Sequence, residues 1–142
     1  MLVRLLYASR AATPLSSATI ESILDSSRAN NRNRGITGIL CYSDDLFIQV
    51  LEGSRDDVCE LYNTIIKDAR HQQVRILHFE EIRERRFGAW NMGQVNIGKI
   101  NPSLLLKYSE RAELNPFNCS GLASLALLDE LIATASVVNR CS

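Results

Sequence analysis

The apolar residues of this chain recur with two different periods, and the order of those periods limits the folds available to it. A period of two is typical of a strand with one buried face, whereas a period of about 3.6 is typical of an amphipathic helix. Leu2–Ser9 has the strand period, with Val3, Leu5 and Tyr7 on one face. A strand therefore opens the chain.

Two segments have the helix period, and each begins at a capping residue. Ser16 or Ser17 can cap a first helix, which we expect to run to about Asn30, where a polar stretch begins. Ser54 with Asp57 resembles a capping box and opens a second helix with a strong amphipathic stripe.

Five segments have the strand pattern, so the element order is βαββαββ. The expected strands are Leu2–Ser9, Gly35–Tyr42, Leu46–Gly53, Val74–Ile82 and Trp90–Ile97. Because strands flank each helix, both helices can cover one face of a single sheet. The sequence therefore predicts the α+β class, as a ferredoxin-like βαββαββ arrangement in which a five-stranded mixed sheet has two helices on one face.

The segment after Asn101 has a different character. Pro102–Tyr108 predicts a short helix, and Leu122–Val138 predicts a helix that is apolar on most sides. Asp129 and Glu130 lie in the middle of the second helix and argue against a membrane span. We expect these C-terminal helices to lie on the other face of the sheet or at an oligomer interface.

The charge balance and the cysteines argue against several functions. Lysine plus arginine equals aspartate plus glutamate, at 16 each, so no overall field favours nucleic acid or a membrane surface. The four cysteines lack the close spacing of a zinc site, and neither histidine forms a metal-ligand cluster with them. Free thiols, and a first segment unlike a signal peptide, favour a reduced, cytoplasmic location.

Tyr7 and Gln49 are polar residues at positions where the strand period predicts burial. Gln49 lies between Phe47 and Leu51 on the buried face of its strand. A buried carboxamide costs free energy unless it is hydrogen-bonded, and it offers both an acceptor and two donors. Either both residues are core side chains with satisfied tips, or they border a ligand, and the strand pattern alone leaves both interpretations open.

Five short segments occur in one order along Leu2–Ile97. They are L-Y-A-S-R, N-N-x-x-x-G-I-T-G-I-L, F-I-Q-V-L-E-G, D-A-R-H and W-N-M-G. Together they resemble the BLUF family, the domains that sense blue light using FAD. The resemblance implies a photosensor domain over residues 1–98 that binds FAD non-covalently, followed by a C-terminal helical extension over residues 99–142.

The resemblance implies a photochemical role for four residues. Tyr7 matches the family's photoactive tyrosine and Gln49 its switching glutamine, while Trp90 and Met92 match the pair beside that glutamine. Tyr7 is then expected to pass on an electron and a proton, and Gln49 to carry the proton and end rotated, tautomerised or both. The expected product is a red-shifted signalling state. Whether Trp90 points inward or outward stays open.

Further residues are expected to bind the flavin. Ile23 and Ile65 lie on the inward stripes of the two helices and match the residues that sandwich the ring. The other matches border the ring or its side chain, and they are Asn30, Asn31, Asp68, Arg70 and His71. Asn31 is expected to hydrogen-bond the carbonyl region of the ring. Arg28 belongs to a basic cluster that either approaches the flavin phosphates or is solvated.

No second domain is expected beside the sensor, and in this respect the chain resembles the short BLUF proteins. Those proteins act through a separate effector protein and tend to form homo-oligomers, so the chain is not expected to be an enzyme. Two rival interpretations remain. One is a light-independent ferredoxin-like module that binds a small ligand or a flavin, and the other is a flavoenzyme with redox turnover.

Overall fold

The computed structural model describes residues 1–134 and confirms the predicted α+β, ferredoxin-like class. The elements, in chain order, are β1 (Leu2–Ala11), α1 (Ser17–Arg34), β2 (Thr37–Ser43), β3 (Leu46–Ser54), α2 (Arg55–Lys67), β4 (His71–Ile82), β5 (Gly93–Asn96), the short 3-10 helix η1 (Ile97–Lys99), α3 (Pro102–Tyr108) and α4 (Gly121–Ala133). The predicted element order βαββαββ is therefore confirmed, with the two C-terminal helices after it.

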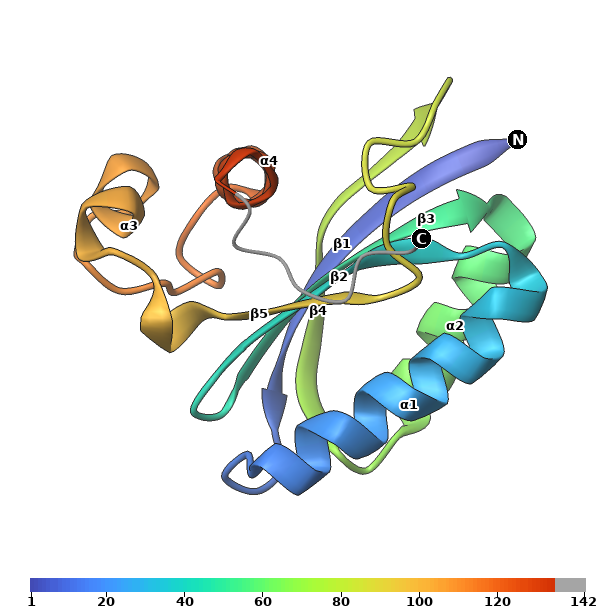
Figure 1. Ribbon diagram of the computed structural model, residues 1–142, viewed down its shortest axis with the longest axis horizontal. Helices are drawn as coiled ribbons and strands as arrows, with labels where there is room; N and C mark the ends of the chain where they lie inside the picture. Colours follow the sequence, from blue (N-terminus) through green and yellow to red (C-terminus); the bar gives the residue numbers. More distant parts are fainter. Residues whose placement is uncertain (135–142) are drawn as a thin grey trace.

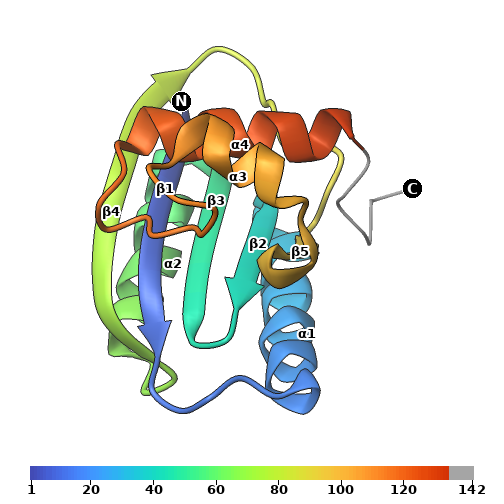
Figure 2. The same cartoon turned by 90° about the vertical axis from the view of Figure 1, so that its left-hand side faces the viewer.

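The strands form one mixed sheet in the order β4-β1-β3-β2-β5. All neighbouring pairs are antiparallel except β2 and β5, which run parallel. Figure 1 shows α1 and α2 on one face of the sheet and α3 and α4 on the other, and Figure 2 shows α4 crossing the strands near one end. The C-terminal helices thus cover the second face. The predicted extension of α4 to Val138 lies outside the described residues.

Each face of the sheet buries its own apolar cluster. The helix-side core lies under α1 and α2 and contains inward residues of β1 and β3, among them Tyr7 and Phe47. The tail-side core contains the opposite residues of the same strands, such as Leu6 and Ile48, together with α4. Helix α4 contributes four leucines to the tail-side core, and they are Leu125, Leu127, Leu128 and Leu131. Successive residues of one strand therefore serve different cores, as the period of two requires.

Helix α1 extends further than the sequence predicted. Ser16 caps its start, as expected. The prediction of an end near Asn30 was wrong, because polar residues on the exposed side of a helix lower its propensity only slightly. The helix ends at Gly35, whose φ of 65° is left-handed and whose amide donates to the Asn31 carbonyl. The next strand accordingly begins at Thr37 rather than at Gly35.

The fourth strand is longer and the fifth shorter than predicted. β4 begins at His71 rather than Val74, and β5 has only four residues. Trp90 precedes β5, and its carbonyl accepts a hydrogen bond from the Gly38 amide at 3.0 Å. The two residues that follow Trp90 form a bend, which interrupts the strand that the sequence predicted.

Gly38 of β2 occupies a position that leaves no room for a side chain. A Cβ atom there would lie 1.9 Å from the carbonyl oxygen of Val50 on β3. We predict that Gly38→Ala lowers the free energy of unfolding by about 1–3 kcal/mol or more, because the strands must separate to admit the methyl group. Urea denaturation measures the change. Gly98→Ala is the control, since its Cβ would meet only Asn96 Oδ1, at 3.3 Å. Equal denaturation midpoints for the two variants would contradict this packing.

Candidate functional site

Tyr7 of β1 and Gln49 of β3 lie opposite each other in the middle of the sheet. They are register partners in an antiparallel pair and are buried, with 1% and 4% of their surface exposed. The Tyr7 hydroxyl donates a hydrogen bond to Gln49 Oε1, and Gln49 Nε2 donates to the Met92 sulfur at 3.2 Å. Three side chains from three segments thus form one buried polar group, which we call the Tyr7–Gln49–Met92 triad.

The surroundings of Tyr7 keep its phenol neutral. Burial is the main cause that raises the pKa of Tyr7 above the ordinary 10.0, and Tyr62 and Asp68 raise it further. The His71 ring lies 6.4 Å from the Tyr7 ring, and the pKa of His71 is lowered chiefly because burial disfavours the imidazolium form. Tyr7 is therefore a hydrogen-bond donor, and the neighbouring imidazole is neutral near pH 7.

The segment that leads into β4 brings three predicted residues close to the Tyr7 end of the triad. Asp68 and Arg70 form an ion pair in which Nη2 lies 2.7 Å from Oδ2. This hydrogen-bonded pairing lowers the pKa of Asp68 and raises that of Arg70. His71 Nδ1 shares a hydrogen bond of 2.9 Å with the Ser9 hydroxyl. The segment therefore places a charged pair and a neutral imidazole near the phenol.

Helix α2 packs less completely on the sheet than α1 does. Ile23 of α1 is buried, but Ile65 of α2 is only half-buried, and Val58 is the one fully buried residue of α2, a helix that is described throughout. Tyr62 of α2 packs edge-on against Tyr7, with the ring centroids 5.8 Å apart. Apolar side chains of two neighbouring helices, partly exposed on one of them, are suited to holding a flat aromatic group. The two predicted isoleucines thus border the same region as the triad.

Asn31 is a buried amide whose hydrogen-bonding capacity is only half used. Its Nδ2 donates to the Asn91 carbonyl at 3.3 Å, whereas its Oδ1 has no hydrogen-bond partner within residues 1–134. A buried oxygen without a donor costs free energy, so this position fits a ligand that supplies one. The adjacent Asn30, in contrast, is exposed on α1.

Trp90 and Met92 lie in different cores, although the sequence placed both on one strand. Met92 is fully buried in the helix-side core, whereas Trp90 belongs to the tail-side core. The bend at Asn91 and Met92 changes the face of the sheet to which the side chains point. The period of two residues that holds within a strand therefore does not apply between Trp90 and Met92. The question that the sequence left open is thereby answered, because Met92 contacts Gln49 and Trp90 faces the other side of the sheet.

Arg28 has a contact that the sequence did not predict. Its Nε and Nη2 donate to the Met92 carbonyl at 3.4 and 3.3 Å, and the side chain is half-buried. Arg28 is therefore directed at the backbone of the segment that carries Met92, next to the contact between Asn31 and Asn91. The sequence could have indicated this contact, because Arg28 and Asn31 are three residues apart and therefore share a helix face.

A hollow of about 1180 Å³ lies apart from the triad, beside the β5 edge of the sheet. Its wall is formed by the start of α1, the turn between β2 and β3, and residues 94–101, and it includes none of the predicted site residues. Within residues 1–134 no three His, Cys, Asp or Glu side chains are grouped as metal ligands. The same residues contain no helix that is long and apolar enough to cross a bilayer.

The fold and the site together define a class of small α+β domains in which a buried tyrosine–glutamine pair lies beneath two helices, one of them incompletely packed. A family model described as sensors of blue-light using FAD, BLUF, matches residues 2–93. The chain belongs to the BLUF family. The resemblance seen in the sequence is thus confirmed, and FAD is the flavin that this family uses.

Solved structures of BLUF proteins align with nearly the whole chain. The dark-state structure of the BLUF protein BlrB is 34% identical, with a TM-score of 0.78, and covers 94% of this chain and 96% of that one. The photo-activated structure of BlsA is 31% identical, with a TM-score of 0.79, and covers 93% and 95%.

A curated relative of much greater length matches only part of this chain. The photoactivated adenylate cyclase subunit alpha of Euglena gracilis is 40% identical over 88 residues, which are 62% of this chain and 9% of that protein. The chain thus spans only about a tenth of the length of the curated relatives it matches.

The raised pKa of Tyr7 gives a test by alkaline titration. We predict that Tyr7→Phe leaves the phenolate absorbance unchanged up to the pH at which the protein unfolds, because Tyr7 does not ionise while it is buried. In the unfolded chain it ionises near pH 10, so its contribution to stability is present below pH 10 and is lost as the pH rises further. The free energy of unfolding should therefore fall less steeply above pH 10 in the variant. A tyrosine that titrates near pH 10 in the folded wild type and is missing from the variant would contradict this environment.

Proposed function

We propose that the chain is a blue-light photoreceptor that binds FAD non-covalently between α1 and α2, with the edge of the flavin ring against the Tyr7–Gln49–Met92 triad. The observation that carries the proposal is the triad itself, a phenol and a carboxamide joined by a hydrogen bond in the middle of the helix-side core. The family's use of FAD makes a flavin the appropriate ligand.

The proposed site uses the predicted residues according to their positions. Ile23 and Ile65 would hold the faces of the ring, since they lie on the facing sides of the two helices. Asn31 would hydrogen-bond the polar edge of the ring, because a flavin imide offers a donor that Asn31 Oδ1 lacks and a carbonyl acceptor beside it. Four residues would border the ring or its side chain less directly, and they are Asn30, Asp68, Arg70 and His71.

When bound, FAD supplies the absorption of blue light and an excited state that is a strong oxidant. Tyr7 would give up an electron and then its hydroxyl proton, and the hydrogen bond to Gln49 Oε1 offers that proton a path. Gln49 would carry the proton and return it when Tyr7 is restored. No bond forms between the protein and the flavin, and Gln49 is left rotated, tautomerised by transfer of a proton from its nitrogen to its oxygen, or both.

A rotated Gln49 amide has a consequence for Met92. In the present arrangement Gln49 Nε2 donates to the Met92 sulfur, which is an acceptor only. Rotation would turn Oε1 toward the sulfur, and two acceptors cannot form a hydrogen bond. The photoreaction is therefore proposed to release Met92 from Gln49, and its output is a biased conformational equilibrium.

We further propose that the chain is not itself an enzyme and passes its signal to a separate effector protein. The support is the alignment with BlrB and BlsA over nearly their full lengths, in contrast to the cyclase, in which the match is a small part. We also propose that the chain forms a homo-oligomer in the cytoplasm. Its photosensor domain would comprise residues 1–98 and its C-terminal extension residues 99–142.

Absorption spectra before and after blue light test the proposed roles of Tyr7 and Gln49. The wild type should be yellow and show a reversible red shift, whereas Tyr7→Phe and Gln49→Leu should stay yellow and lose the shift, because each removes one member of the hydrogen-bonded pair. Tyr42→Phe is the matched control and should keep the shift, because Tyr42 of β2 pairs across the sheet with Phe47 and not with Gln49. A colourless wild type supplied with FAD would favour a light-independent module instead, and an intact shift in Gln49→Leu would refute the mechanism.

FAD affinity tests the proposed role of Asn31. We predict that Asn31→Ala weakens FAD binding roughly tenfold, the effect of losing one buried hydrogen bond. Asn33→Ala is the control on the same helix, since Asn33 is exposed. Titration of flavin fluorescence gives both dissociation constants, and equal values for the two variants would exclude Asn31 from the binding site.

A further inference from the structure

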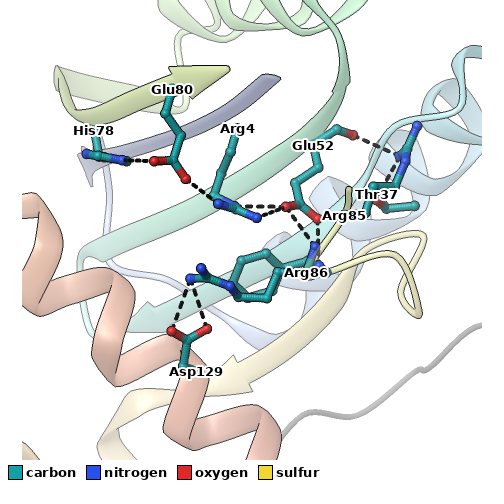
Figure 3. A network of polar contacts seen from close by, with 9 residues as sticks. Arg4, Thr37, Glu52, His78, Glu80, Arg85, Arg86 and Asp129 are labelled. Carbon is teal, nitrogen blue, oxygen red and sulfur yellow. Dashed lines mark hydrogen bonds and ion pairs between the residues drawn. The ribbon is translucent and has the colours of Figure 1, made fainter. Parts of the chain in front are cut away.

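Glu52 of β3 is a fully buried carboxylate on the face of the sheet opposite to Gln49. Its Oε2 accepts hydrogen bonds from Arg4 Nε at 2.8 Å and from the Arg86 amide at 3.1 Å. Its Oε1 accepts from the Phe87 amide at 2.6 Å. Figure 3 shows these contacts converging on one carboxylate between the strands and a loop.

A buried carboxylate is costly unless a counter-charge and hydrogen bonds compensate it. Arg4 on β1 provides the counter-charge, and its guanidinium also pairs with Glu80 on β4, which is bonded to His78 at 3.0 Å. The other hydrogen bonds to the Glu52 carboxylate come from backbone amides of the β4–β5 loop, residues 83–92. Glu52 thus holds the β4–β5 loop, which ends at Met92, against the sheet.

Arg86 connects this fastened loop to α4. Its amide donates to Glu52, while its Nη1 donates to the two carboxylate oxygens of Asp129 at 3.1 and 3.3 Å. Phe87 and Trp90 of the same loop pack with α4 in the tail-side core, but apolar packing is non-directional. The ion pair to Asp129 is a directional contact, so it relates the orientation of the loop to that of the helix (Figure 3).

We propose that Arg86 is a positioning residue that couples the contact between Gln49 and Met92 to helix α4, an inference that rests on the proposed function. Release of the Met92 side chain by Gln49 lets the loop shift against the Glu52 carboxylate that accepts the Arg86 and Phe87 amides. The Arg86 guanidinium, which is paired with Asp129, passes this shift to α4. The side chains of the ion pair are 44% and 42% exposed, so the pair adds little to stability and can change without unfolding the protein.

Amide hydrogen exchange of the full FAD-loaded chain, in the dark and under continuous blue light, tests the coupling. In the wild type, illumination should change the exchange of α4. Arg86→Gln and Asp129→Asn should each keep the flavin red shift and lose the light-dependent change in α4. The double variant with the charges exchanged, Arg86→Asp with Asp129→Arg, should recover it, which a merely structural role of either residue does not predict.

The matched control is Arg83→Gln, which removes an exposed arginine from the same loop and should leave the response of α4 intact. A full light-dependent change of α4 in Arg86→Gln would overturn the inference. A wild type with a red shift but an unchanged α4, or an exchanged pair that stays unresponsive, would overturn it as well while leaving the proposed function in place. A wild type without a red shift would remove the proposed function itself, and the spectrum alone identifies that case.

Discussion

The register of β1 against β3 is the constraint on which the site depends. It sets Tyr7 directly opposite Gln49 on the helix-side face. A slip of one residue would send the Tyr7 side chain to the other face, because side chains alternate along a strand. The apolar residues on both faces of the two strands resist such a slip, since it would exchange the members of two complete cores. The hydrogen bond between phenol and carboxamide is therefore a product of the whole sheet.

The two faces of the sheet are proposed to have different functions. The helix-side face has the triad and the helices α1 and α2, between which a flavin is proposed to bind. The tail-side face has α4 and the buried carboxylate of Glu52. The β4–β5 loop connects the faces, because Met92 belongs to one core and Trp90 to the other. The proposed photochemistry on one face and the proposed output on the other thus share a single short segment of backbone.

Much of this arrangement could be predicted from the sequence, since periods of apolar residues fix strands, helices and buried faces. The burial of Tyr7 and Gln49 followed from the period of two. The bend after Trp90 could not be predicted, because no residue in that segment disfavours a strand strongly enough to reveal it. The long-range pairing of Arg4 with Glu52 was also missed, since a period locates a charged residue on a face but not its partner across the sheet. The FAD ligand came only from the family resemblance.

The light-minus-dark infrared difference spectrum of the FAD-loaded protein with isotope-labelled glutamine tests most directly whether Gln49 responds to light. Illumination should shift a side-chain amide band of glutamine, because Gln49 changes its hydrogen-bond partners, and Gln49→Leu should abolish this signal. A wild-type flavin that shifts its absorption with no change in any glutamine band would contradict the proposed role of Gln49, because the red shift would then arise without it.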